Sequence, residues 1–209
     1  MSSLHNESVT SGHWDDAYSH GDTTRSWYRR ESTWSLHMLD ECDVSPASSV
    51  IDVGGGASTL VDALLRRGQH DVTVLDISAT SLDIARERLG AAGEGTRWVV
   101  ADLLTWQPDR TFDVWHDRAL LHFLVDDAAR HAYVQVLNLA THSGSVAVFA
   151  TFAPDGPEHC SGLPVARYGA HDLAELLGVR WRLCGAEREE HVTPGGAVQP
   201  FTWAAFRRG

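Results

Sequence analysis

Hydrophobic and polar positions follow two alternating periods along most of this chain. Short apolar runs rich in β-branched residues have the length and composition of strands buried on both faces of a sheet. Between these runs, apolar residues recur three and four positions apart, as in a helix with one buried face. The runs lie at 49–53, 71–77, 97–101, 112–115 and 144–150. Regular alternation of strand and helix predicts an α/β fold, a doubly wound and mostly parallel sheet with helices on both faces.

The last third of the chain departs from this alternation. Residues 153–168 are rich in proline and glycine and predict a loop, and residues 170–177 predict a short helix. Two long strand-like runs follow at 181–192 and 197–207, separated by the turn sequence Pro-Gly-Gly. Two such runs across a tight glycine turn predict a C-terminal antiparallel hairpin.

The N-terminal part is polar first and aromatic afterwards. Residues 1–12 are small and polar and predict a disordered tail, so we expect one domain at 13–209 with an N-terminal arm at 13–45. The arm contains Trp14, Tyr18, Trp27 and Tyr28, followed by a helical pattern at 32–42. These aromatics either pin the arm to the body of the domain or form a lid over a ligand.

Composition narrows the classes of function. The chain has 209 residues, 43% of them hydrophobic, which fits one domain with a substantial core. A formal net charge of −11 argues against nucleic acid or an anionic membrane as a partner. All 17 basic residues are arginine, which excludes chemistry based on a lysine. Three scattered cysteines predict neither a disulfide framework nor a metal site, and with no export or membrane-spanning segment in the sequence they favour the cytoplasm.

Glycines and acids gather where the strands are expected to end. The first strand runs directly into Gly54-Gly55-Gly56, where the backbone can approach a ligand closely. Asp52, Asp76 and Asp102 stand at the ends of three successive strands, so a parallel sheet places them along one edge. A carboxylate accepts two hydrogen bonds from a ribose diol, and another can accept from an adenine amine. This edge therefore predicts a site for a nucleoside.

These motifs resemble those of the class I S-adenosylmethionine-dependent methyltransferases, in particular a small bacterial single-domain branch. The resemblance covers nearly the whole chain and is carried by residues 50–58, 75–78, 101–103 and 112–118 together with the terminal hairpin. It implies a seven-stranded Rossmann-like sheet and S-adenosyl-L-methionine as the cofactor. It also implies a set of cofactor-binding residues: Asp52, Gly54, Gly56, Asp76, Ile77, Asp102, Leu103 and His116.

A nicotinamide-dependent oxidoreductase is an alternative from another class. Gly54 and Gly56 satisfy the first two positions of a dinucleotide-binding fingerprint, but the third position falls on Thr59 rather than glycine. The predicted C-terminal antiparallel hairpin also favours the methyltransferase. The cofactor of a methyltransferase has no phosphate, so it does not require the full fingerprint. A protein that only binds the cofactor has no positive feature in its favour.

Transfer of an activated methyl group requires alignment with a nucleophile more than it requires a base. The candidate catalytic residues are His116, Asp117 and His122, with His191 on the hairpin as a further candidate. Cys160 lies in the loop after the fifth strand, on the same edge, and joins the four aromatics as an acceptor-site candidate. The absence of an added substrate domain favours a small-molecule acceptor, and a protein lysine methyltransferase is the alternative.

Overall fold

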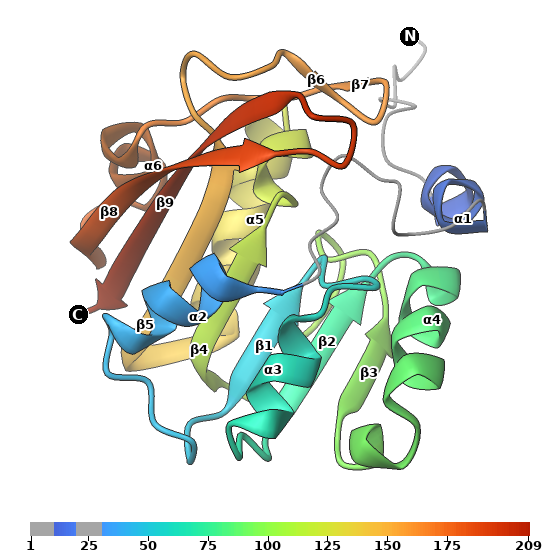
Figure 1. The fold of residues 1–209 in the computed structure, drawn as a ribbon. Helices are drawn as coiled ribbons and strands as arrows, with labels where there is room; N and C mark the ends of the chain where they lie inside the picture. The colour runs from blue at the N-terminus through green and yellow to red at the C-terminus, as the bar shows by residue number, and fades with distance from the viewer. Residues whose placement is uncertain (1–10, 20–30) are drawn as a thin grey trace, which may run out of the picture.

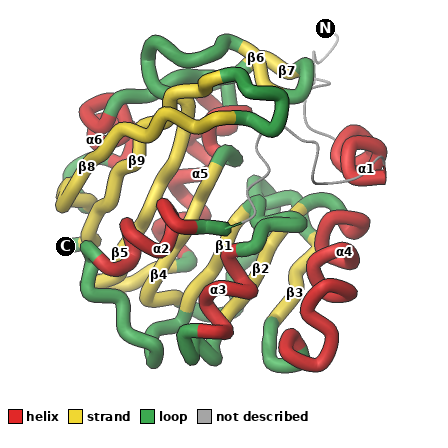
Figure 2. Tube along the Cα trace, viewed as in Figure 1, coloured by secondary structure: helices red, strands yellow, loops and turns green. Residues whose placement is uncertain are grey.

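A seven-stranded sheet forms the centre of the computed structural model, which describes residues 11–19 and 31–209 (Figures 1 and 2). The strands lie in the order β3-β2-β1-β4-β5-β9-β8. Strands β1 to β5 pair in parallel, and β9 is antiparallel to both of its neighbours. The strands are β1 (Val50–Val53), β2 (Val72–Asp76), β3 (Arg97–Val100), β4 (Phe112–Arg118), β5 (Thr141–Phe152), β8 (Trp181–Val192) and β9 (Val198–Arg208). The predicted fold class and the terminal hairpin are confirmed.

Helices cover both faces of the sheet, as the red segments on either side of the yellow strands show in Figure 2. The helices are α1 (Ser11–Ser19), α2 (Thr33–Asp40), α3 (Leu60–Arg66), α4 (Ala79–Leu89), α5 (Asp127–Leu139) and α6 (Ala170–Leu177), with short 3-10 turns η1 (Gly90–Gly93) and η2 (Leu121–Phe123). One apolar core lies under α2, α3 and α4, and a second lies under α5 and α6. Two cores on opposite faces explain why β1 and β2 are buried at every residue.

Two of the helices begin directly after a capping side chain. Ser78 precedes α4, and its side chain accepts a hydrogen bond from the backbone N–H of Ser81 at 3.1 Å. Asp126 precedes α5 and accepts from the N–H of Ala129 at 2.8 Å. Each cap satisfies a backbone donor that the first turn of a helix leaves unpaired, and is worth about 1 kcal/mol.

Several boundaries differ from the sequence prediction. Strand β4 continues to Arg118 instead of stopping at residue 115, because it still pairs with β1 up to Asp117 and with β5 up to Arg118. Strand β5 begins at Thr141, and the loop expected at 153–168 contains a small hairpin of β6 (His159–Cys160) and β7 (Leu163–Pro164). Helix α1 begins at Ser11, and residues 1–10 lie outside the described part of the chain. Cys184 is exposed on the outermost strand.

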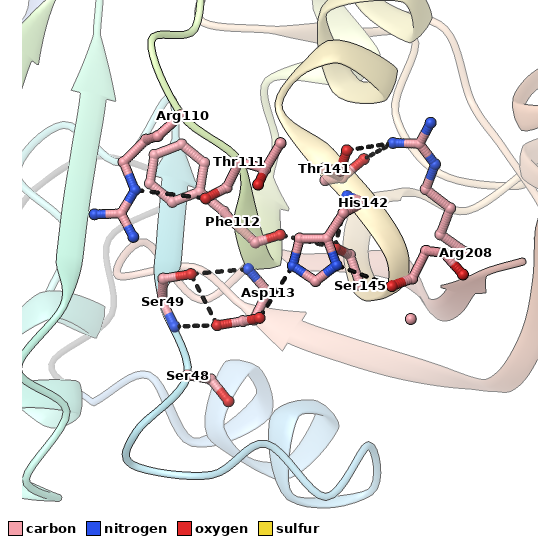
Figure 3. A network of polar contacts seen from close by, with 12 residues as sticks. Ser48, Ser49, Arg110, Thr111, Phe112, Asp113, Thr141, His142, Ser145 and Arg208 are labelled. Carbon is pink, nitrogen blue, oxygen red and sulfur yellow. Dashed lines mark hydrogen bonds and ion pairs between the residues drawn. The ribbon is translucent and has the colours of Figure 1, made fainter.

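The amino-terminal ends of β1, β4 and β5 are tied together by polar side chains (Figure 3). Asp113 accepts from the backbone N–H of Ser49 at 2.7 Å and from its hydroxyl at 2.9 Å, while the Ser49 hydroxyl oxygen accepts from the N–H of Asp113 at 2.9 Å. His142 lies 3.1 Å from the same carboxylate, and Ser145 donates to the carbonyl of Phe112 at 2.8 Å. This end of the sheet is a closed hydrogen-bonded network.

Candidate functional site

A cavity of about 490 Å³ opens at the other end of the sheet, above the carboxyl ends of β1, β2 and β4. Its wall joins the glycine turn after β1, the residues that follow β2 and β3, the end of β4 with η2, and helix α1. The volume lies within the range of about 300–1,000 Å³ found for small-molecule sites. The predicted cofactor residues that line the cavity are Asp52, Gly54, Asp76, Ile77, Asp102, Leu103 and His116.

The glycine turn has a backbone that only glycine adopts without strain. Gly54 has φ +65° and Gly56 has φ +47°. A β-carbon on Gly54 would lie 2.7 Å from Leu120 Cδ1, and one on Gly55 would lie 2.7 Å from Asp52 Oδ2. Gly56 is not in the cavity wall itself, but a β-carbon there would lie 3.2 Å from Asp76 Oδ2. Side chains at this turn would therefore clash with the residues packed around it.

The three strand-end acids have different surroundings. Asp52 is buried; its Oδ1 is hydrogen-bonded, and its Oδ2 is buried with no hydrogen-bond partner within the described residues. Asp76 accepts from the N–H of Ser78 at 2.8 Å. Burial raises the pKa of Asp76 to about 6, the negative charge of Asp52 adds to the rise, and backbone hydrogen bonds oppose it. Asp102 is exposed and accepts from the N–H of Leu104 at 2.9 Å.

His116 lies beside Asp52 because the two residues are register partners on paired strands. Its Nδ1 is 2.7 Å from Asp52 Oδ1, and its Nε2 is 3.0 Å from the hydroxyl of Ser35 on α2. The ring is 1% exposed and lies 6.3 Å from the indole of Trp203. Both ring nitrogens are therefore occupied in a buried chain that runs from α2 to the cavity wall.

The other catalytic candidates lie behind the cavity wall. Asp117 is fully buried and accepts from the Tyr133 hydroxyl at 2.5 Å and from backbone N–H groups of η2. Burial raises the pKa of Asp117 to about 6, against these hydrogen bonds. His122 is fully buried, and burial together with the charge of Arg118 lowers its pKa to about 3, so its imidazole is a weak base. His191 is 2% exposed and packs edge-on against Phe201 at 5.9 Å.

Three of the acceptor-site candidates line the same cavity as the acids. Trp14 and Tyr18 of α1 line the cavity together with Cys160 of β6. Trp14 packs edge-on against Phe123 of η2, with ring centroids 5.0 Å apart. The two remaining candidates, Trp27 and Tyr28, lie outside the described residues.

Helix α1 is joined to the body of the protein by a carboxylate. Asp15 accepts from the Ser78 hydroxyl at 2.6 Å and from the N–H of Thr80 at 3.2 Å, at the first turn of α4. The Ser78 hydrogen bond lowers the pKa of Asp15. Asp15 thus holds α1 against the start of α4, beside which it lies in Figure 1.

Sequence reasoning missed several residues of the cavity wall, among them Arg118 and Phe123. Arg118 follows His116 by two positions in β4, so the period of a strand places both side chains on the same face. That signal was available in the sequence, but the strand was expected to end at residue 115. Phe123 lies on η2, a short turn that leaves no clear periodic pattern.

The residues present fit S-adenosylmethionine. The unpaired, buried Oδ2 of Asp52 offers an acceptor at the glycine turn, which a β-carbon at Gly54 or Gly55 would obstruct. Asp76 and Asp102 add two further acceptors in the cavity wall, with Ile77 and Leu103 as apolar neighbours. No group of three or more His, Cys, Asp or Glu side chains that could hold a metal ion occurs within residues 11–19 and 31–209.

Comparisons with known proteins agree with this geometry. Residues 50–144 match the family model described as a methyltransferase domain. The chain is 28% identical over 145 residues to a trans-aconitate 2-methyltransferase of Rhizobium etli, an alignment that covers 68% of this chain and 54% of that protein. The chain therefore spans about half the length of this curated relative.

Solved structures show the same fold at low sequence identity. An S-adenosylmethionine-dependent methyltransferase from Anabaena variabilis superposes with a TM-score of 0.74 at 16% identity, covering 95% of each chain. A Burkholderia thailandensis 1,6-didemethyltoxoflavin-N1-methyltransferase, with its substrate and S-adenosylhomocysteine bound, has a TM-score of 0.61 at 19% identity and covers 85% of this chain and 82% of its own. Residues 50–144 thus match a methyltransferase domain, and the chain has the fold of S-adenosylmethionine-dependent methyltransferases, with the cavity at the carboxyl edge of its seven-stranded sheet.

Proposed function

We propose that this protein transfers a methyl group from S-adenosylmethionine to a nucleophilic atom of a small-molecule acceptor. The observation that carries the proposal is one cavity whose wall combines two chemically different groups of residues. We assign the glycine turn and the strand-end acids to the cofactor and call them the cofactor end, and we assign Trp14, Phe123, Arg118 and Cys160 to the acceptor and call them the acceptor end. A cavity of about 490 Å³ suits a nucleoside cofactor and a compact acceptor better than a segment of another macromolecule.

The reaction requires the protein mainly to align the nucleophile with the methyl group and to exclude water. When bound, the sulfonium supplies an activated methyl carbon: a lone pair of the acceptor bonds to it while the carbon–sulfur pair moves to sulfur, which leaves as a neutral thioether. The protein contributes by holding the nucleophile in line and by removing water that would compete. An acceptor that arrives deprotonated needs no base.

We propose that His116, a residue of the cavity wall, is the best catalytic candidate. Its first role is to position Asp52. Its hydrogen bond fixes Asp52 Oδ1 and leaves Oδ2 for the cofactor. Nε2 can take a proton from an acceptor only if the ring releases the Ser35 hydroxyl. If the ring takes a proton, His116→Ala is expected to lower turnover more than cofactor affinity. If the ring only positions Asp52, the variant is expected to weaken cofactor binding at least as much as it lowers turnover. His116→Gln, which keeps a polar side chain beside Asp52, separates the two roles.

We propose that helix α1 is the lid of the acceptor end. It reaches the cavity with Trp14 and Tyr18, and Asp15 anchors it to α4. Aromatic faces over the reaction centre exclude water and can attract a cationic sulfonium. Deleting residues 1–30 is expected to abolish methyl transfer while circular dichroism and the thermal transition still report a folded domain.

Calorimetric titration with S-adenosylmethionine, S-adenosylhomocysteine and NAD tests the cofactor assignment. We expect the first two to bind, and binding of NAD alone would overturn the proposal.

Incubation with methyl-labelled cofactor and fractionated lysate tests the acceptor. Label in the small-molecule fraction is the expected result, and label in protein bands would replace the proposed small-molecule acceptor with a protein acceptor. Within the described residues no helix is long and apolar enough to cross a membrane.

A further inference from the structure

Arg118 is the arginine of the cavity wall. It is the last residue of β4, two positions after His116, and the remaining described residues of the wall include no other arginine. Lysine is absent from the whole chain, so no other permanently charged cationic side chain contributes to the described part of the wall. On this assignment the acceptor end has a guanidinium and the cofactor end has the strand-end acids, while the fourth acid of the wall, Asp126, is the exposed cap of α5.

Arg118 packs against an aromatic ring and shares the cavity wall with apolar side chains. Its guanidinium carbon lies 5.7 Å from the ring centroid of Phe201, and Phe123 and Leu120 line the same cavity. His122 is fully buried between Phe123 and Phe152, at ring distances of 4.5 and 4.9 Å, and adds no charge there. A charge in such surroundings is screened less than one in water, so its attraction for an anion is stronger.

Charge complementarity with the reaction favours an anionic acceptor. A cationic amine entering this end would meet the positive guanidinium and the positive sulfonium together. A carboxylate is attracted by both, and its planar pair of oxygens matches the fork of N–H donors on a guanidinium. We propose that Arg118 binds a carboxylate of the acceptor, so that the acceptors of this protein are organic acids.

This inference rests on the proposed methyl transfer, and its experiment has two arms that fail separately. In the first, S-adenosylhomocysteine is titrated into the wild-type protein and the Arg118→Gln, Arg118→Lys and Arg167→Gln variants. Arg167 is the matched control, because it hydrogen-bonds to Gly156 and Glu158 outside the cavity wall. In the second arm, aliphatic, unsaturated and aromatic mono-, di- and tricarboxylic acids, and the corresponding amides, are titrated into each protein saturated with S-adenosylhomocysteine.

We expect at least one acid to bind and its amide not to bind. Arg118→Gln should weaken that acid about 10- to 100-fold, as expected for loss of a charge-assisted bidentate contact, while changing the affinity for S-adenosylhomocysteine less than about threefold. Arg118→Lys should recover part of the loss, and Arg167→Gln should behave as wild type. The same acid should receive label from methyl-labelled cofactor.

Three results would overturn the inference. The first is that no acid binds although S-adenosylhomocysteine does, and the second is that acid and amide bind equally well. The third is that Arg118→Gln weakens the binding of S-adenosylhomocysteine as much as the binding of the acid, which would assign the guanidinium to the carboxylate of the cofactor. Failure of S-adenosylhomocysteine to bind the wild-type protein would instead refute the proposed function. The thermal transition of each variant, together with the first arm, identifies a variant that does not fold.

Discussion

The two ends of the central sheet use the same residue type in opposite ways. At the amino end, Asp113 is held by Ser49 and His142, and these hydrogen bonds lower its pKa although burial acts to raise it. At the carboxyl end, burial raises the pKa of Asp76 to about 6, and Asp52 keeps one buried oxygen without a hydrogen-bond partner in the described chain. The carboxylate at the amino end is hydrogen-bonded by the protein itself, whereas the carboxyl end keeps an acceptor that a ligand can satisfy.

This difference separates stability from function. A buried acceptor without a partner costs free energy in the folded protein, and a protein retains such a group where a ligand compensates for it. Substitutions at the carboxyl end should therefore change binding more than folding. Substitutions at the amino end should do the reverse, and each prediction below tests one side of this division.

Asp76→Asn should have the largest effect. Replacing the carboxylate with an amide removes the charge-assisted hydrogen bonds to a ribose diol, and the affinity for S-adenosylhomocysteine should fall about 100-fold in calorimetric titration. The free energy of unfolding at pH 7.5 should stay the same or rise, because the variant removes a charge whose burial is unfavourable. A large loss of stability with unchanged affinity would reverse the roles of the two ends.

Asp113→Ala tests the amino end. The buried Ser49 loses the acceptor for its backbone N–H and its hydroxyl, so the free energy of unfolding should fall by about 2 kcal/mol in urea titration. The affinity for S-adenosylhomocysteine should change less than about twofold. A stronger effect on affinity than on stability would show that the two ends are coupled through β1 and β4.

The pH dependence of cofactor binding should report Asp76. Its pKa is raised from 3.8 to about 6, so in the protein without cofactor most Asp76 side chains are protonated at pH 5 and ionised at pH 7. If only the carboxylate accepts from the ribose, affinity for S-adenosylhomocysteine should rise about tenfold between these values. Asp76→Asn should flatten this rise, and an unchanged profile in the variant would assign the titration to another group.

The contribution of Asp76 to folding stability changes with pH in the opposite direction to the cofactor affinity. Between pH 3.8 and about 6, folded Asp76 holds a proton that the unfolded chain has lost, so its contribution to the free energy of unfolding declines as pH rises through that window. Above pH 6 the contribution is constant. Comparing urea midpoints of wild type and Asp76→Asn at pH 4.5 and 7.5 measures this decline.

The cofactor end could be predicted from sequence because its signals are local. Glycines with positive φ follow an apolar run directly, Asp76 is the last residue of β2, and Asp102 lies two residues after the end of β3. Residues that depend only on the ends of parallel strands are brought together by the sheet itself. The cavity contains these side chains where the strand order places them.

The acceptor end depends on contacts between distant segments, which no local pattern contains. Whether Asp117 faces the cavity or Tyr133 depends on how α5 packs against β4, and Ser35 reaches His116 only because α2 crosses the opposite face. The extension of β4 beyond residue 115 depends on pairing with β1 up to Asp117 and with β5 up to Arg118. Aromatic residues in the arm indicated a lid, but only the fold shows that Trp14 meets Phe123.

Asp15→Ala should have the smallest effect and tests whether the lid acts on the cavity. Removing the acceptor for the Ser78 hydroxyl and the Thr80 N–H weakens the docking of α1 on α4 by about the value of a helix-capping contact. Release of S-adenosylhomocysteine, followed by stopped-flow tryptophan fluorescence, should become about threefold faster while the far-ultraviolet circular dichroism is unchanged. Asp83→Ala is the matched control, because Asp83 is exposed on α4 and pairs with Arg86 of the same helix. Equal release rates in both variants would show that α1 covers the cavity without controlling passage through it, and the acceptor end would then be defined by β4, η2 and β6 alone.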